Sequence, residues 1–370
     1  MRYNPPRTLA PGSARTPEDW GRSREFALNH TSRPASPRRR SALRLVLLLG
    51  TVVVASIAGV LLALTLGTGR NLAAMVVTPA PNVARDPNAA PLLALPTIAA
   101  TGTGAPQPAT ILLLGTDRRP AEPVIPRSDA ILVVRIEPAT QRVAVLSLPR
   151  DLWVPIPGHD HNRLNAAYLW GEHDGPPGAG MALARATVST LLGLPIDYVA
   201  VTDFRGFAAL IDTLGGITIN VERPLADDSF PTLDLGTTTV RFQAGPQVMD
   251  GVTALTYARI RHPDSDFARG GRQQVVLLAI AQALRDRGYL ANLLAAERLT
   301  GACADYTQTD MPSARMLELV WAMHTLDATT VERYALHETD VTFGVDNDRF
   351  AQTPLPGVIE HYARLLLYGP

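Results

Sequence analysis

The sequence contains no lysine, so all 34 of its basic side chains are arginine. Its 34 acidic residues balance them, and a formal net charge of zero gives no overall electrostatic reason to bind nucleic acid. Cysteine is nearly absent too, since Cys303 stands alone. A single cysteine excludes an intrachain disulfide and a zinc site built from several cysteines. The chain of 370 residues exceeds one average domain and can bury a sizeable core.

One long stretch lacks charge altogether, LVLLLGTVVVASIAGVLLALTLGTG at residues 45–69. As a helix its 25 residues would measure roughly 37 Å, which is enough to cross a hydrocarbon core of about 30 Å with some tilt. A cleavable signal peptide has a shorter apolar stretch, and the LAA at 72–74 is a poor cleavage site. We therefore expect an uncleaved transmembrane helix here rather than a buried core helix.

Positive charge is distributed unevenly around this stretch. The first 44 residues hold ten arginines against three acidic residues. Four arginines come just before the apolar run (Arg38, Arg39, Arg40 and Arg44), and only Arg70 comes just after it. The positive-inside rule then leaves the N-terminus in the cytoplasm and the C-terminal part outside. We expect a disordered cytoplasmic arm at 1–44, a transmembrane helix at 45–69, a Pro/Ala-rich linker at 70–109 and an extracytoplasmic domain at 110–370.

Apolar strands and amphipathic helices alternate after the linker. The pattern predicts strands at 110–115, 129–138, 142–149, 197–203, 217–221 and 330–337, and helices at 180–193, 204–216, 249–261, 269–287, 312–326 and 357–369. Asp203 is expected to cap the second helix and Gly215 to end it. The stretch 222–248 reads as irregular. Helices on both faces of a mixed central sheet would give a three-layer α/β/α domain.

Charged residues gather where three of the predicted strands begin or end. Asp117 follows the first strand, Asp129 opens the second, and Arg150 follows the third together with Asp151. A fourth cluster, YARIRHPDSDFARGGRQQ at 257–274, holds four arginines, two aspartates and a histidine. Ligands collect at strand ends in sheets of this kind. We therefore expect these four segments to converge, although a solvated charged surface is the alternative.

The residue types of these segments favour a particular ligand. Arg269, Arg272 and Gln273 are spaced i, i+3, i+4 near the start of a predicted helix, where arginine opposes the helix dipole unless an anion is bound. Guanidinium groups bind phosphate oxygens in bidentate fashion. Magnesium takes one or two carboxylates together with phosphate oxygens and water. The set therefore predicts a pyrophosphate site, with Asp117 and Asp129 as candidate ligands of Mg²⁺.

Several longer motifs together resemble the LytR–CpsA–Psr family. In chain order they are ILLLGTDRR, RSDAILVVRI, VLSLPRDLWVPIPG, RLNAAYLWG, DYVAVTDFRGFAALIDTLGGITINV and MDGVTALTYARIRHPDSDFARGGRQQ, spread over residues 110–285. The resemblance implies an α/β/α fold whose hydrophobic pocket holds a polyprenyl chain. It also implies transfer of a glycopolymer, such as teichoic acid or capsular polysaccharide, from a polyprenyl pyrophosphate carrier to peptidoglycan.

The same resemblance implies roles for single residues. Asp117 and Asp129 match the magnesium-binding aspartates of the family. The matching pyrophosphate-binding positions are Arg119, Arg127, Arg150, Arg259, Arg261, Arg269, Arg272 and Gln273. Within the catalytic group, which includes Arg261, we expect Asp264 or Asp266 to accept the proton of the attacking hydroxyl.

Two other functions would use the same residues. A pyrophosphatase would transfer the phosphoryl group to water, and the sequence cannot separate it from a transferase. A non-catalytic regulator that binds lipid-linked precursors would keep the arginines but would not need the two metal-binding aspartates. One segment departs from the family pattern, since it carries His159, Asp160 and His161. We expect an exposed loop there rather than a transition-metal site.

Overall fold

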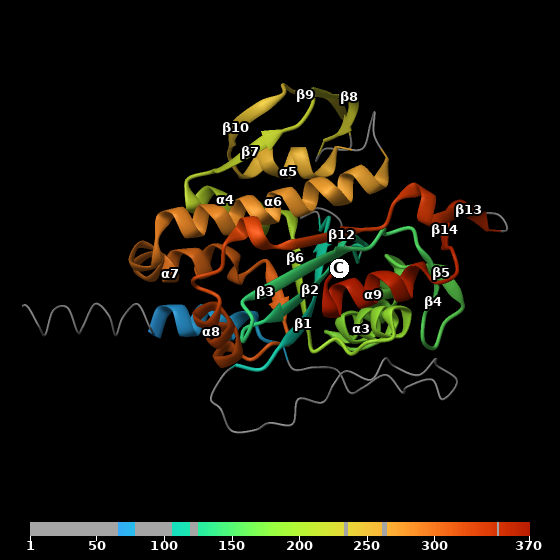
Figure 1. Cartoon of the computed structure of the whole chain (residues 1–370), viewed down its shortest axis with the longest axis horizontal. Coiled ribbons are helices and arrows are strands. Elements are labelled where there is room, and N and C mark those ends of the chain that lie inside the picture. Colours follow the sequence, from blue (N-terminus) through green and yellow to red (C-terminus); the bar gives the residue numbers. More distant parts are fainter. Residues whose placement is uncertain (1–65, 78–105, 119–124, 233–235, 261–264, 346–347) are drawn as a thin grey trace, which may run out of the picture. The chain divides into compact units, whose positions relative to one another are not determined.

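The centre of the molecule is a six-stranded mixed sheet (Figure 1). The computed structural model describes residues 66–77, 106–118, 125–232, 236–260, 265–345 and 348–370. The strand order is β11 (Thr307–Thr309), β6 (Tyr198–Asp203), β1 (Ala109–Thr116), β2 (Ser128–Glu137), β3 (Arg142–Ser147) and β12 (Glu332–Ala335). β1 runs parallel to β6 and β3 runs parallel to β12, while the other neighbours are antiparallel. The predicted mixed sheet is therefore confirmed.

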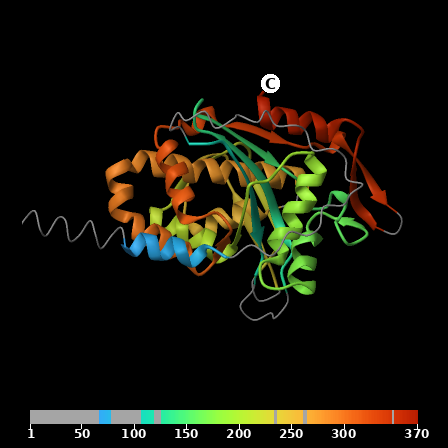
Figure 2. The ribbon, with the colours of Figure 1, turned by 90° about the horizontal axis from the view of Figure 1, so that it is seen from below.

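Helices cover both faces of this sheet, as Figure 2 shows. On one face lie α2 (Ala166–Asp174), α3 (Ala179–Leu192) and α9 (Val358–Tyr368), which share a core with Leu112, Val133 and Leu146 of the sheet. The other face carries α4 (Phe204–Leu214), α6 (Asp266–Arg287) and α8 (Ser313–Ala322), and α7 (Tyr289–Ala304) packs on α4. Because both faces are covered, the central strands are continuous apolar runs.

A second, smaller core lies beside the sheet and corrects one expectation. The stretch 222–248 is not irregular, because it forms β8 (Leu225–Pro231), β9 (Thr237–Phe242) and most of β10 (Gly245–Met249). β8 pairs with β9, and β10 pairs with β7 (Ile217–Val221). Their inward side chains pack with α5 (Gly251–Arg259), α4 and α6. These strands were missed because they are short, one pair contains a bulge, and Pro and Gly interrupt the alternation.

Local capping sets two helix starts. The Asp203 carboxylate accepts hydrogen bonds from the backbone N–H groups of Arg205 and Gly206, and Gly215 ends α4 in the left-handed conformation with φ 85°, as predicted. Ser265 caps α6, which therefore begins at Asp266, three residues before the predicted start. The earlier start places Asp266 in the first turn of the helix, where its negative charge suits the helix dipole.

Two short hairpins complete the domain near one end of the sheet (Figure 1). They are β4 (Trp153–Pro155) with β5 (His161–Arg163), and β13 (Val341–Val345) with β14 (Asp348–Pro354). Two 3₁₀ turns, at Ala328–Thr330 and Glu338–Asp340, flank β12. Both hairpins border the segment that carries Arg150, because the backbone N–H of Gln352 donates to the carbonyl of Asp151 over 2.9 Å.

The chain just after the apolar run is docked on the domain. Residues 66–75 are helical, so the helix continues past residue 69 into the predicted linker. Asn71 Nδ2 donates to the carbonyl oxygen of Glu297 over 3.0 Å, and the N–H of Val77 donates to that of Thr309 over 2.8 Å. Within the described part of the chain, no helix is long and apolar enough to cross a membrane. The predicted transmembrane helix at 45–69 lies mostly outside the described residues and stays a prediction.

Candidate functional site

A β-bulge shapes the end of the sheet where the site lies. Gly115 of β1 pairs with Ala130, but the next residue, Thr116, pairs with Ser128, so Asp129 is an extra residue in β2. A bulge bends its strand and re-aims the side chain of the inserted residue, and bulges are common beside active sites. Here the Asp129 carboxylate receives a hydrogen bond from Arg150 Nη1 over 2.5 Å. The bulge therefore lets the side chain at the start of β2 contact the turn that follows β3.

Arg150 is held among three carboxylates. Besides Asp129, its Nε lies 3.6 Å from Asp151 Oδ2 and 3.7 Å from Asp266 Oδ1. Burial lowers the pKa of the Arg150 guanidinium, but attraction to Asp129, Asp266 and Asp151 leaves that pKa above its ordinary value. Arg150 Nε has no hydrogen-bond partner despite being buried. The Arg150 guanidinium is therefore a fixed positive charge whose Nε–H can still donate a hydrogen bond.

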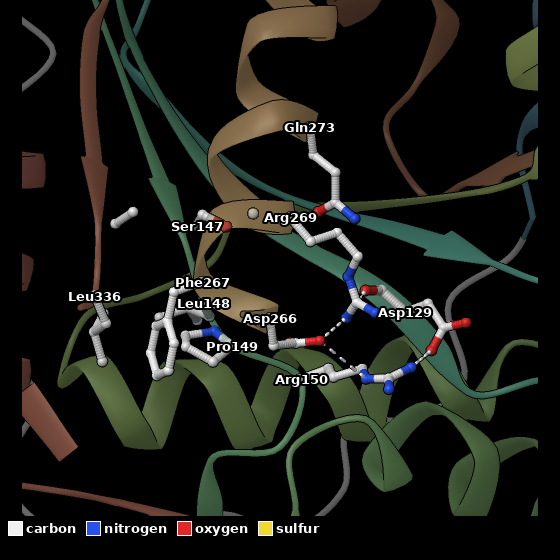
Figure 3. A pocket seen from close by; sticks show the side chains of 12 residues that line it. Asp129, Ser147, Leu148, Pro149, Arg150, Asp266, Phe267, Arg269, Gln273 and Leu336 are labelled. Atoms are coloured by element: carbon white, nitrogen blue, oxygen red, sulfur yellow. Dashed lines mark hydrogen bonds and ion pairs between the residues drawn. The ribbon is translucent and has the colours of Figure 1, made fainter. Parts of the chain in front are cut away.

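The first turn of α6 supplies the opposite side of the cluster. Asp266 Oδ1 and Arg269 Nη2 form an ion pair over 2.7 Å, and the same Nη2 donates to the backbone carbonyl of Asp129 over 3.3 Å. Figure 3 shows the Asp266 carboxylate between the guanidinium groups of Arg150 and Arg269. Burial raises the pKa of Asp266, against the lowering effect of the two arginines, and burial lowers the pKa of Arg269. Asp266 is thus more basic than an ordinary aspartate.

These groups line one pocket with about 280 Å³ of empty space, part of it open to solvent. Its polar end is formed by Asp129, Arg150, Asp266, Arg269 and Gln273, and its apolar end includes Leu148, Pro149, Phe267 and Leu336 (Figure 3). Ser147, Gly270 and Ala335 complete the lining. A pocket that is charged at one end and apolar at the other suits a ligand with an anionic head and a hydrocarbon tail.

Close packing fixes the first turns of α6 against the sheet. A Cβ atom on Gly270 would lie 2.7 Å from Ser147 Oγ, so a larger residue there would require the Ser147 hydroxyl to move. One turn later, Gln274 Nε2 donates to the carbonyl oxygen of Tyr334 on β12 over 2.7 Å. The close approach at Gly270 and the hydrogen bond from Gln274 hold α6 against the sheet. Asp266 and Arg269 are therefore positioned by the packing of α6 as well as by their own ion pair.

Other predicted residues lie apart from this pocket. Asp117, just past β1, pairs with Arg259 at the end of α5 over 3.3 Å, and the Arg259 guanidinium lies over the rings of Phe204 and Phe230 at 4.7 and 5.4 Å from their centroids. Arg272 is buried and donates to the carbonyl oxygen of Ile260. Arg272 does not line the pocket, which corrects the expectation that it shares a face with Arg269 and Gln273.

Four predicted positions cannot be assigned to the cluster. Arg127 is described and exposed, beside the bulge. Arg119, Arg261 and Asp264 lie outside the described residues, and their roles stay predictions. Of the two candidate proton acceptors, Asp266 is therefore the one that the structure places in the pocket.

A series of ion pairs that supports the pocket was not predicted from the sequence. Arg163 of β5 pairs with Asp151 over 3.1 Å and with Asp348 of β14 over 2.5 Å. It thereby connects both hairpins to the residue next to Arg150. Phe343 of β13 also packs edge-on against the pocket residue Phe267, with 6.4 Å between ring centroids. No local signal could reveal these contacts, because Arg163 and Asp348 are 185 residues apart.

The available oxygen donors fit magnesium better than a transition metal. Asp117 and Asp129 lie at the adjoining ends of β1 and β2, and two carboxylates suffice for a Mg²⁺ ion that takes its other ligands from phosphate and water. In the described ranges, no group of three or more His, Cys, Asp or Glu side chains could hold a metal by itself. His159, Asp160 and His161 are exposed, and the His159 ring lies 4.7 Å from that of Trp170. His159 and Asp160 thus lie in the expected exposed loop, whereas His161 opens β5.

A comparison with known proteins decides the family. The model of the LytR_cpsA_psr family matches residues 93–354. The chain belongs to this family. It is 31% identical to the regulatory protein MsrR of Staphylococcus aureus over 212 residues, which cover 56% of the chain and 58% of MsrR. It is 35% identical to the polyisoprenyl-teichoic acid–peptidoglycan teichoic acid transferase TagT of Bacillus subtilis over 174 residues, covering 46% and 51%. These alignments span little more than half the length of the curated relatives.

Solved structures of family members have the same fold. A structure of TagT bound to LI-WTA matches with a TM-score of 0.55 and 25% identity, covering 70% of this chain and 89% of that one. A structure of the LytR-CPS2A-psr family protein YwtF (TagT) with bound octaprenyl pyrophosphate lipid matches with a TM-score of 0.52 and 24% identity, with the same coverage. The expected α/β fold of the family is therefore confirmed, and these likenesses extend across most of the described domain.

Proposed function

We propose that this chain is a membrane-anchored, magnesium-dependent transferase. It moves a glycopolymer of the teichoic acid or capsular polysaccharide type from a polyprenyl pyrophosphate carrier to peptidoglycan. The observation that carries the proposal is the ion-paired set of Asp266, Arg150, Arg269 and Asp129, which is partly to fully buried at the charged end of a pocket in the family fold. It is supported by the name of TagT and by the octaprenyl pyrophosphate bound in a relative.

In the proposed site two arginines, Arg150 and Arg269, bind the pyrophosphate. Arg150 and Arg269 carry donors toward one pocket and can exchange carboxylate partners for phosphate oxygens. A group fixed in advance stabilises charge that grows during reaction better than water does, because it need not reorganise. Mg²⁺ held by Asp117 and Asp129 would add positive charge against the phosphates. The apolar end, near Leu148 and Leu336, would take the first part of the polyprenyl chain.

Asp266 is assigned as the proton acceptor. A hydroxyl of the acceptor sugar attacks the phosphorus that bears the glycopolymer and forms a new P–O bond. Its proton passes to the Asp266 carboxylate, whose raised pKa makes it a better base than an ordinary aspartate. The bond from that phosphorus to the bridging oxygen breaks, and its electron pair leaves with polyprenyl phosphate. Phosphate binding to Arg150 and Arg269 weakens their hold on Asp266 and so favours the transfer.

The proposed location follows the distribution of arginine around residues 45–69. The N-terminus lies in the cytoplasm and the catalytic domain lies outside, tethered near a carrier that cannot leave the bilayer. A reporter enzyme that works only outside the cytoplasm, fused after Pro108, should be active. Activity of a cytoplasm-specific reporter at the same position would contradict the location.

Transfer is separated from hydrolysis by following the glycan. The full chain, reconstituted in lipid nanodiscs with Mg²⁺, is given a carrier with a labelled glycan and a peptidoglycan oligomer. The proposal predicts label on the oligomer, with the Asp266→Asn variant as inactive control. Free labelled glycan phosphate that forms equally with and without the oligomer would indicate a pyrophosphatase. Tight binding of the carrier without turnover would indicate a regulator, a role suggested by the name of MsrR.

A further inference from the structure

α7 has an unusual distribution of apolar side chains. Its sequence, YLANLLAAERLTGACA, is apolar around most of its circumference, yet Ala295 is the one buried residue among its 16. Tyr289, Leu290, Leu293 and Leu294 are exposed, Leu290 to 67%. A helix that is apolar all round is normally buried in a core or in a membrane. α7 packs on α4 and also contacts α6 and β11, yet these neighbours leave its leucines at 290, 293 and 294 exposed.

α8 extends this exposed surface. Leu317, Val320 and Trp321 are exposed, Trp321 to 59%. The Trp321 ring meets that of Tyr289 edge-on, with 5.7 Å between centroids, so the two helices form one surface. We call this surface the α7–α8 apolar face; its residues are Tyr289, Leu290, Leu294, Leu317, Val320 and Trp321. Large apolar side chains that are exposed together in this way mark a candidate interaction site.

The anchor points to what covers this face. Helical residues 66–75 pack on α7, since Asn71 Nδ2 donates to Glu297 and to Thr300, and Leu72 and Met75 are buried. Figures 1 and 2 both place this segment beside α7 and α8. The first described residues of this helix, 66–69, belong to the uncharged run 45–69, and Leu66 is 65% exposed. If the run spans the bilayer, the bilayer surface lies next to α7.

We propose that the α7–α8 apolar face lies in the outer interface of the bilayer. Leucines would then face the acyl chains, and Tyr289 and Trp321 would lie at headgroup depth, where these two residue types are enriched. The anchor helix and this face together fix the orientation of the domain, so that the pocket does not swing freely on a tether. This inference rests on the proposed membrane anchor, but it does not depend on the reaction catalysed.

Spin labels measure the depth of the face directly. Cys303, the single cysteine, is replaced by alanine, and a nitroxide is attached at Leu290→Cys or, independently, at Val320→Cys. The matched control is Val248→Cys on β10, a strand beside the second core, where Val248 itself is 77% exposed. In the full chain in nanodiscs, labels at 290 and 320 should collide with dissolved oxygen more than with a water-soluble nickel chelate. The label at 248 should show the opposite preference.

The outcomes separate the inference from the proposals beneath it. Resistance of the chain to carbonate extraction reports the anchor, and transfer activity reports the reaction. If the chain resists extraction while labels at 290 and 320 are as open to the nickel chelate as the label at 248, the inference is wrong and the anchor stands. Labels shielded from both reagents, with dipolar broadening between copies, would show that a second copy covers the face and would also overturn it. Unchanged melting temperatures of the labelled variants ensure that each readout reports a folded domain.

Discussion

Charged side chains are usually exposed and large apolar side chains are usually buried. The pocket departs from the first rule, and the α7–α8 apolar face departs from the second. At the pocket, charged groups are partly or fully buried and form ion pairs over 2.5 to 3.7 Å, as Arg150 and Arg269 do. On α7 and α8, large apolar groups are exposed without cover among the described residues. Burying charge and exposing apolar area both oppose folding. These departures are what the two proposals require, with an anionic ligand at the first and a lipid surface at the second.

The largest expected effect comes from removing the proton acceptor at the pocket. Asp266→Asn should lower the single-turnover rate by about 10²–10⁴-fold, the range that general base catalysis contributes. Carrier affinity should be kept or rise, because the change removes a negative charge from the anion site. Single-turnover kinetics and carrier binding, measured on the same preparation, test both parts. Full activity in a variant that melts like the wild type would remove Asp266 from the mechanism.

The next effect comes from the arginines that bind phosphate. Arg150→Lys and Arg269→Lys each lose bidentate geometry, and a hydrogen bond to a charged group contributes about 1.5–3 kcal/mol. Each should therefore weaken carrier binding or turnover by roughly tenfold or more. Arg241→Lys on exposed β9 is the matched control and should be silent. If all three variants behave alike, the pocket is no anion site and the contrast between the two regions disappears.

A third prediction concerns the carboxylates at the sheet end. Asp117→Asn and Asp129→Asn should each raise the Mg²⁺ concentration needed for half-maximal activity, because each removes a charged ligand from a site that has few. Both residues lie at strand ends outside the apolar core, so the melting temperature should change little. Magnesium titration of the transfer rate is the measurement. If a variant keeps the wild-type magnesium dependence, the residue that it replaces is not a magnesium ligand.

The smallest effect belongs to the support behind the pocket. Ion pairing with Arg163 lowers the pKa of Asp348, so the pair adds stability above the ordinary pKa of aspartate and loses it as the pH falls through the folded-state value. Asp348→Asn should reduce the free energy of unfolding by about 0.5–1 kcal/mol near pH 7. The difference should shrink in acid. Denaturant titrations at pH 7 and in acid measure it, and an equal loss at both would assign it to some other contact.

The two regions also differ in how much of their structure can be predicted from the sequence. Asp129, Arg150 and Asp266 could be expected to meet because each lies where a strand or helix begins or ends, and such points share an edge of the sheet. Spacing alone misplaced Arg272, since a three-residue step turns it 60° away from Arg269 around the helix, toward α5. The bulge at Asp129 depends on pairing and could not be seen locally.

The apolar face could not be found in the sequence at all. The pattern of α7 is apolar around most of its circumference, so it gives no clear preferred face. Its exposure follows from tertiary packing, because α4 and residues 66–75 cover part of it and leave Leu290 and Leu294 outside. Contacts between distant segments, such as Arg163 with Asp348, are equally invisible before the fold is known.

The central claim is that Asp266, partly buried between Arg150 and Arg269, accepts the proton. The most direct measurement is the pH dependence of the single-turnover transfer rate for the full chain in nanodiscs. The rate should rise with pH as Asp266 deprotonates, with an apparent pKa above the ordinary range of aspartate, because burial raises it. This rise should be lost in Asp266→Asn and kept in Asp264→Asn. A rise that persists in Asp266→Asn and is lost in Asp264→Asn would contradict the assignment.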